Sequence, residues 1–262
     1  MALVSNTRSL FLNDGQPSLP KVVASGFGGW GGVVGGTAVS VSVWFKTNAE
    51  RKGTGTICAW GDDSTAGAGV HIVHLNQPPV GSEGDSAFAH RPHFIMGGEE
   101  FRSWELSGSG ISDEDWHHFV FTCPTTGTPS DVKFYHNGSL ATAHATSGST
   151  PKSTAAGTFF RAGVDVENLF QLNAHIDELA VWNTELSALE VTDIYNSGSA
   201  NLDLSVNGGN YASSASGQLW WRFEDPSADQ VMESFAGVSG TNRTGFLPEL
   251  FVTTVYRTDV AT

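Results

Sequence analysis

The sequence predicts an all-β sandwich of two antiparallel sheets with one short helix. Three observations support this prediction. Short stretches along the chain alternate apolar and polar side chains, as strands with one buried face do. The 31 glycines, many of them between these stretches, supply the turns that connect such strands. A single segment, residues 187–195, carries a helical pattern instead.

In the N-terminal half, strands are expected wherever alternation is bounded by turn residues. Residues 38–45, AVSVSVWF, alternate strictly and place three valines and Phe45 on one face. Residues 76–91 contain Pro-Pro and several glycines, so a long loop at one end of the sandwich is expected there. The other expected strands in this half are residues 8–12, 21–24, 55–60, 69–75 and 93–96.

The stretch from Ala174 to Gly198 is the best-organised part of the chain. Residues 176–182 alternate with apolar side chains on both faces, which predicts a strand buried on both sides. Ser187 and Glu190 have capping-box spacing at the start of a helix of about three turns. Asn-Ser-Gly then ends the helix with residues that tolerate the left-handed conformation. Before this stretch, strands are expected at residues 116–122, 132–136, 139–144 and 158–163, the second and third joined by an Asn-Gly hairpin turn.

After residue 198 the composition changes. Residues 199–217 are polar and are expected to form a loop, whereas residues 218–225, QLWWRFED, predict a late core strand. Residues 251–256 predict a final extended segment. The chain is therefore divided into a sandwich domain at residues 1–198 and a C-terminal extension at residues 199–262 with an extended tail.

Two long motifs resemble one protein family. IDELAVWNTELSALEVTDIYNSG, residues 176–198, resembles the closing motif of laminin G-like, concanavalin A-like jelly-roll domains. DEDWHHFVFTCPTTGTPSDVKFYHNGSLATA, residues 113–143, resembles the family's Trp-His-His/Tyr-Val strand and the following strand that ends in Tyr-x-Asn-Gly. The resemblance covers residues 8–198. It implies a concanavalin A-like (laminin G-like) jelly-roll sandwich.

The C-terminal extension adds a second resemblance. Its Trp-Trp-Arg-Phe block at 220–223 and its FVTTV end at 251–255 are similar to laminin G-like structural proteins of tailed marine phages. This implies a non-enzymatic virion protein, a capsid decoration or head-surface protein that also adheres to glycans. The partners expected are capsid or other virion proteins, host-surface glycans and further copies in a homo-oligomer. The alternatives are a tail-fibre or receptor-binding lectin and a polysaccharide-degrading enzyme.

Charge and composition limit the other partners. The 13 Lys and Arg against 27 Asp and Glu give a formal net charge of −14, which disfavours nucleic acid and anionic membranes. No stretch approaches the ~20 apolar residues of a membrane span. The N-terminus lacks the features of a signal peptide. We therefore expect synthesis in the host cytoplasm and residence on the virion surface. Because the cytoplasm keeps thiols reduced, Cys58 and Cys123 are expected to be buried free thiols, with a disulfide as the alternative.

Oxygen-bearing side chains predict a calcium site. Asn13, Asp14 and Asp177 are the candidate ligands, because Ca²⁺ takes hard oxygen ligands and the resembled family often carries Ca²⁺ near these loops. Asp62 and Asp63 are weaker candidates. The alternative is that these carboxylates only cap turns.

Three tryptophans near predicted loops, Trp30, Trp60 and Trp104, are the candidates for stacking on a sugar. The alternative for each is packing in the core or at a sheet edge. The other five tryptophans fall in predicted strands and are expected in the core.

The sequence gives little support for a transition-metal site built from its histidines, for a catalytic site or for a dinucleotide site. His71 and His74 are three apart on a strand and point to opposite faces, and of His117 and His118 one points inward and one outward. Glu-x-Asp-x-x-Glu, which pairs glycosidase carboxylates, and Gly-x-Ser-x-Gly are both absent from the sequence. Residues 26–31 match Gly-x-Gly-x-x-Gly, but a strand follows where a dinucleotide site needs a helix. We therefore expect no catalytic residues.

Overall fold

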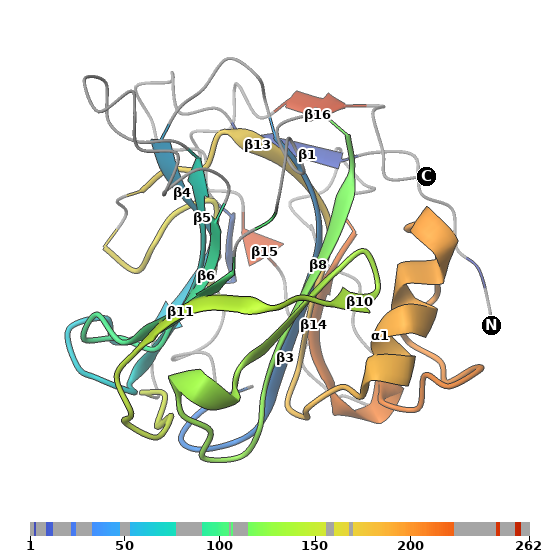
Figure 1. Cartoon of the computed structure of the whole chain (residues 1–262). Helices are drawn as coiled ribbons and strands as arrows, with labels where there is room; N and C mark the ends of the chain where they lie inside the picture. Colours follow the sequence, from blue (N-terminus) through green and yellow to red (C-terminus); the bar gives the residue numbers. More distant parts are fainter. Residues whose placement is uncertain are drawn as a thin grey trace.

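The predicted fold class is confirmed: two antiparallel sheets face each other, and the short helix α1 lies outside them (Figure 1). Within the described part of the chain, no helix has the length and hydrophobicity needed to cross a membrane. The computed structural model describes residues 3, 9–12, 22–24, 33–47, 53–76, 91–104, 106, 115–155, 160–167, 170–222, 245–246 and 255–257.

The first sheet, called the β3 sheet, has the strand order β10-β9-β8-β3-β13-β1-β16, and β14 also pairs with β13. Every pair in it is antiparallel. Its strands are β1 (Ser9–Leu12), β3 (Val39–Thr47), β8 (His117–Cys123), β9 (Lys133–His136), β10 (Ser139–Leu140), β13 (Ala174–Trp182), β14 (Gly217–Trp221) and β16 (Val255–Arg257).

The second sheet, called the β4 sheet, has the strand order β11-β7-β6-β5-β4-β12-β2-β15 and is also antiparallel. Its strands are β2 (Val22–Ala24), β4 (Gly53–Gly61), β5 (Gly69–Asn76), β6 (Arg91–Ile95), β7 (Phe101–Trp104), β11 (Ala143–Ser147), β12 (Arg161–Ala162) and β15 (Gly245–Phe246).

The main core lies between the two sheets. The valines of β3 and Phe45 are fully buried on the inner face, as the alternation predicted. They share one apolar cluster with Trp60, Ile72 and Phe94 of the β4 sheet. Burial of each such side chain contributes about 1.5–3 kcal/mol, so this layer is the main stabilising element of the sandwich. Both cysteines lie in the same cluster as free thiols, which confirms that prediction.

β13 departs from the strict alternation that was predicted for residues 176–182. Between Asp177 and Ala180 it advances three residues while β3 advances two, from Trp44 to Ser42, which defines a β-bulge. Glu178 adopts φ 48° at this point. The extra residue reverses the faces beyond it, so Ile176 and Leu179 both enter the main core. Strict alternation would place Ile176 and Glu178 on one face with Ala180 and Trp182. That expectation is wrong, because Ile176 lies in the main core and Ala180 and Trp182 lie in the cluster on the outer face.

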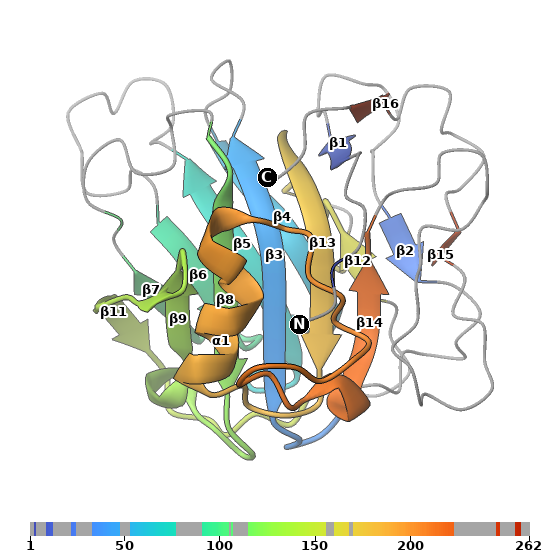
Figure 2. The same cartoon turned by 90° about the vertical axis from the view of Figure 1, so that its right-hand side faces the viewer.

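α1 (Ala188–Tyr195) begins as predicted but is shorter, eight residues instead of about three turns. The Ser187 hydroxyl accepts from the Glu190 backbone, and the Glu190 carboxylate accepts from the Ser187 backbone at 2.9 Å, so the predicted capping box is confirmed. The helix ends at Asn196, whose φ of 47° is left-handed. Figure 2 shows α1 lying across the outer face of β3 and β8.

Residues 199–216 cover more of the same outer face, beside the strand β14 that pairs with β13. Tyr211 donates to the Leu204 carbonyl, and Trp182 Nε1 donates to the Tyr211 hydroxyl, both at 2.9 Å. These residues form a second buried cluster with Val191 of α1 and Trp220 of β14. The strand expected at 218–225 is β14, at residues 217–221. The division of the chain at residue 198 stays a prediction.

Candidate functional site

The structure corrects two of the three predicted sugar-stacking tryptophans. Trp60 and Trp104 are 0% and 1% exposed and pack in the main core. Trp60 lies 5.5 Å from Phe160, and Trp104 lies 5.3 Å from Phe134, between ring centroids. Neither ring has a face for a sugar. Trp104 was expected near a loop because β7 was not predicted from the sequence. Trp30 lies outside the described residues.

Of the three predicted calcium ligands, only Asp177 lies in the described part of the chain. Asp177 is fully buried in the β13 bulge, where its Oδ1 accepts from the Glu178 backbone at 2.9 Å. Asn13 and Asp14 lie outside the described residues, so the site stays a prediction. Asp62 accepts from Ser64 and caps a turn. Over the described ranges, no three His, Cys, Asp or Glu side chains gather in a way that could hold a metal ion.

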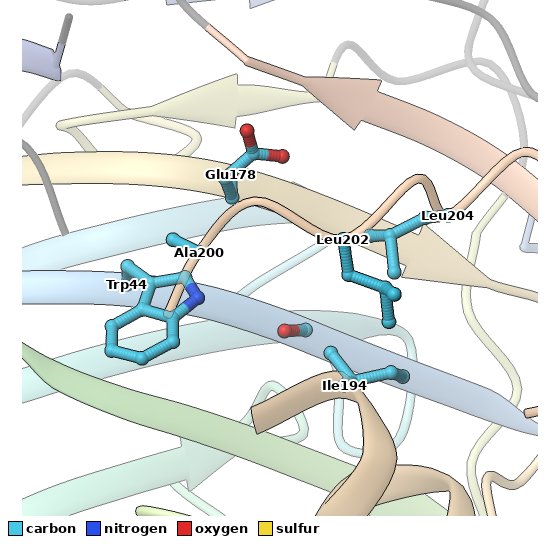
Figure 3. Close-up of a pocket in the computed structure, with 7 residues that line it drawn as sticks. Trp44, Glu178, Ile194, Ala200, Leu202 and Leu204 are labelled. Carbon is cyan, nitrogen blue, oxygen red and sulfur yellow. The ribbon is translucent and has the colours of Figure 1, made fainter. Parts of the chain in front are cut away.

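A small pocket lies on the outer face of the β3 sheet (Figure 3). Residues 199–204 cross over it, and its empty space, counted together with the open solvent at its mouth, is about 220 Å³. The lining is mainly apolar, and Figure 3 shows the carboxylate of Glu178 turned away from Ile194 and Leu202. The residues that line it are Ser42, Trp44, Glu178, Ile194, Ala200, Leu202 and Leu204. A pocket of this size and polarity does not fit a glycan, whose hydroxyls need hydrogen-bonding partners.

The Glu178 carboxylate beside this pocket is engaged by its neighbours. Arg222 Nε donates to its Oε1 at 3.1 Å, and the indole N–H of Trp220 donates to its Oε2. The Arg222 guanidinium also lies 5.2 Å from the Trp220 ring centroid. Both charged side chains are at most 7% exposed. This buried ion pair and its indole hydrogen bond hold β14 against the bulge of β13.

The outer face of the β4 sheet has a different character. A continuous cross-strand row runs over it, in which each residue is the register partner of the next. Adjacent strands lie ~4.8 Å apart, so the interval from β12 to β7 spans roughly 19 Å. Figure 1 shows this face turned away from α1. The row is Arg161, Ala59, His71, Ile95, Phe101 and Ser147.

Polar groups stand along this row. The His71 imidazole Nε2 contacts the Asp63 carboxylate, and the two side chains are 5% and 26% exposed. Arg161 interacts favourably with Asp165, although burial lowers the pKa of its guanidinium more than Asp165 raises it. Charged groups of both signs therefore lie along one face, with His71 itself buried.

Half-buried rings lie at the other end of the row. His93 and Phe101 pack with their ring centroids 5.3 Å apart. His93 Nδ1 is 3.0 Å from the Arg91 carbonyl oxygen. In the register, His93 is opposite Ser103, which is opposite Ala145, so the floor beside the rings is made of small residues. Ser103 is itself buried, so the two rings form the half-exposed part of this end of the face.

Two buried polar atoms on or beside this face have no hydrogen-bond partner in the described structure. Thr56, opposite Val73 in the register, is fully buried, and its hydroxyl is unpaired. The Gln171 amide oxygen is also unpaired. Residue 170 contacts the same strand, because its carbonyl accepts from the Thr56 backbone at 2.8 Å. Unpaired buried polar groups are rare in proteins, so these two atoms need a partner that the described residues do not supply.

The sequence reasoning singled out tryptophans and loop carboxylates and missed this face. The available signal was the outward-pointing residues of β5 and β6, His71, His93 and Ile95, which alternate with apolar residues. That signal becomes a site only when the register places β7 and β12 beside these strands.

The fold defines a jelly-roll sandwich of the lectin-like type. The model of the concanavalin A-like lectin/glucanases superfamily matches residues 29–192, and the chain belongs to this superfamily. The comparison with curated protein sequences found no match.

Solved structures with the same fold support this assignment. A putative carbohydrate binding protein from Bacteroides ovatus has a TM-score of 0.58 at 10% identity, covering 99% of this chain and 62% of that one. The native heptameric SAP-like pentraxin from Limulus polyphemus has a TM-score of 0.52 at 14% identity, covering 74% of this chain and 84% of that one. Our chain thus spans under two thirds of the Bacteroides protein. At these sequence identities the similarity shows a shared fold and nothing more.

Proposed function

We propose that this protein is a non-enzymatic glycan-binding protein and that the outer face of the β4 sheet holds the glycan. The observation that carries the proposal is the cross-strand row on this face, with polar groups at one end and half-buried rings at the other. The printed description of the Bacteroides ovatus protein as a putative carbohydrate binding protein supports the same reading.

The chemistry of the row suits a sugar chain. The Phe101 ring can pack against the apolar face of a pyranose, as aromatic rings do. Arg161 and the partly exposed Asp63 carboxylate, which also contacts His71, offer a donor and an acceptor to hydroxyl groups. A face of roughly 19 Å, from the strand spacing, suits an oligosaccharide better than a single sugar.

The cellular role that we propose is that of a structural protein on the surface of a tailed-phage virion, most simply a capsid decoration protein. It is supported by the resemblance of residues 220–223 and 251–255 to such proteins. Capsid proteins, other copies of this chain and host-surface glycans would be its partners. Ca²⁺ at Asn13, Asp14 and Asp177 belongs to the same proposal. A tail-fibre or receptor-binding lectin would use the same face.

A polysaccharide-degrading enzyme is the less favoured candidate, because two buried carboxylates of the described chain are committed to structural contacts. Glu178 is held by Arg222 and Trp220, and Glu190 accepts from Ser187 and Ser213. Reducing-sugar release from the polysaccharides that bind would contradict the non-enzymatic assignment.

A glycan array tests the binding proposal. The wild-type chain is expected to retain a defined set of glycans, and Phe101→Ala is expected to lose them because the ring platform is removed. Trp116→Ala is the matched control, since Trp116 is also half-buried but lies on the β3 sheet side, 6.1 Å from His175. Equal loss in both variants, or retention by Phe101→Ala, would refute this assignment. Reconstruction of virions by electron cryo-microscopy tests the location, and absence of the protein from particles would refute the virion role.

A further inference from the structure

We propose that Phe170 is a second sugar-stacking platform, at the opposite edge of the glycan face from Phe101. The glycan face is the outer face of the β4 sheet, and with two platforms it selects oligosaccharides long enough to contact both rings. This inference rests on the proposed function and names the ligand class. Three observations carry it: an exposed ring, a strained backbone under the ring, and a loop that is fixed to the edge of the sheet.

The Phe170 side chain is 56% exposed, and it is the one aromatic residue among the exposed large hydrophobic residues of the described chain. Trp60 and Trp104, which were expected to stack on a sugar, are at most 1% exposed. A ring needs a free face to pack against the apolar face of a pyranose. Phe170 therefore has the exposure that these two tryptophans lack.

The backbone of Phe170 is strained. Its φ of 46° is in the left-handed region, where a bulky side chain is an outlier and asparagine or glycine is common. The exposed ring gains little from burial, so the fold does not repay this strain through the side chain. Strained residues of this kind concentrate at ligand-binding sites. The combination of exposure and strain indicates that the ring serves an external ligand.

The ring belongs to the segment between β12 and β13. We call residues 163–172 the Phe170 loop, of which residues 168 and 169 lie outside the described part of the chain. Figure 1 shows this segment, in yellow, projecting from the β4 sheet on the side away from α1. The loop is therefore on the same side of the sandwich as the glycan face.

Hydrogen bonds fix the loop to β4. The Leu172 N–H donates to the Gly163 carbonyl at 2.9 Å, which joins the two ends of the loop. The Gly163 N–H donates to the Ile57 carbonyl at 3.0 Å, and the Thr56 N–H donates to the Phe170 carbonyl at 2.8 Å. A platform that is positioned before the ligand arrives loses less entropy on binding.

The two rings are at opposite edges of the glycan face. The bond from Thr56 to Phe170 continues, along β4, the contacts that β12 and Gly163 make with the same strand. Phe101 lies on β7, and the interval from β12 to β7 spans roughly 19 Å at the usual strand spacing. A disaccharide is too short to contact both rings, whereas a chain of several sugar units can reach from one to the other.

Charged groups of the row lie between the two platforms. Arg161 is on β12, and the Asp63 carboxylate, 26% exposed, contacts His71 on β5. An oligosaccharide that packs on both rings crosses these strands, so the hydroxyls of its inner units come to the charged groups. The rings would set the length of the ligand, and the charged groups would contact its middle.

Calorimetry with three length series tests the inference: cello-, xylo- and galacto-oligosaccharides, each from the disaccharide to the hexasaccharide. In a series that binds, the wild type is expected to gain at least tenfold in affinity from the shortest to the longest member, about 1.4 kcal/mol. Phe170→Ala is expected to remove this gain and to keep the affinity for the disaccharide, whereas Phe101→Ala weakens both. Leu189→Ala is the matched control, since Leu189 is 63% exposed on α1, and it is expected to keep the gain.

Urea denaturation separates a binding role of Phe170 from a structural one. Phe170→Asn removes the ring and places at this φ a residue that tolerates it. The urea midpoint is therefore expected to stay the same or to rise, while the gain in affinity with length is lost. A fall in the midpoint would show that the ring stabilises the fold and would overturn the inference.

The remaining outcomes distinguish the two proposals. A gain with length that persists in Phe170→Ala, or affinity that does not rise with length in the wild type, would overturn the second platform and leave glycan binding intact. Retention of glycans on the array without binding of any hexasaccharide would have the same meaning. If no probe binds and the array is also empty, the proposed function fails and this inference fails with it.

Discussion

The stability of this protein is expected to fall at mildly acidic pH because His118 is buried in its neutral form. The side chain is fully buried, and its Nε2 is 2.8 Å from the Ser42 hydroxyl. Its ring packs against Trp44 and stacks with Tyr195, at centroid distances of 4.9 and 5.9 Å. Burial lowers the pKa of His118 to about 3, and the neighbouring His136 adds to this effect.

The direction of the pH effect follows from linkage. The pKa in the folded state is below the unfolded value of 6.5. Between these two values the unfolded chain therefore binds a proton that the folded chain does not bind. The contribution is fully favourable above pH 6.5 and is lost progressively as the pH falls toward 3. Each pH unit inside this window changes the free energy of unfolding by 1.36 kcal/mol at most. Between pH 7 and pH 5 the loss from His118 alone is about 2 kcal/mol.

Urea denaturation of the wild type and His118→Gln at pH 7 and pH 5 measures this loss. The glutamine amide is neutral at both values and can keep a hydrogen bond to Ser42. The free energy of unfolding of the wild type should therefore fall by about 2 kcal/mol more than that of the variant between the two pH values. Carboxylates that titrate in the same range cancel in this comparison. If both proteins lose the same stability, His118 is not buried in its neutral form and the reasoning fails.

Three further predictions follow from single contacts. Ser187→Ala removes the cap of α1 and should lower the free energy of unfolding by about 1 kcal/mol, whereas Ser187→Asp should retain it, both measured by urea denaturation. Glu178→Gln leaves the buried Arg222 guanidinium without its counter-charge and should lower the free energy of unfolding by about 3–5 kcal/mol. Adding Arg222→Met should recover part of this loss. A double variant no more stable than Glu178→Gln alone would contradict the ion-pair account. Burial raises the pKa of both thiols, that of Cys123 to about 12, so Cys58 and Cys123 should react with a thiol reagent at pH 8 only after unfolding.

The local chemistry of several elements could be predicted from the sequence. The capping box at Ser187 depends on residues three apart in the chain, and the Asn137-Gly138 hairpin depends on two adjacent residues that tolerate positive φ. The inward valines of β3 follow from alternation alone, because one buried face imposes a period of two. These features need no information from distant parts of the chain.

The glycan face and the faces of β13 depend on distant residues. The bulge at Glu178 arises where β13 changes partners, from β1 on one side of it to β14 on the other. β7 has four residues, too few for alternation to mark it, so Trp104 was placed near a loop instead of in the core.

By itself the sequence determined the class of fold, the positions of most strands and the caps of the helix, since propensity, alternation and turn chemistry act over a few residues. Only the tertiary structure decided which tryptophans are buried and which side chains share a face. Cross-strand register joins Arg161 to Ala59, and Ile95 to Phe101, across gaps in the chain that no local pattern spans. The candidate site is a product of that register, because the strands that carry it become neighbours only when the sheet forms.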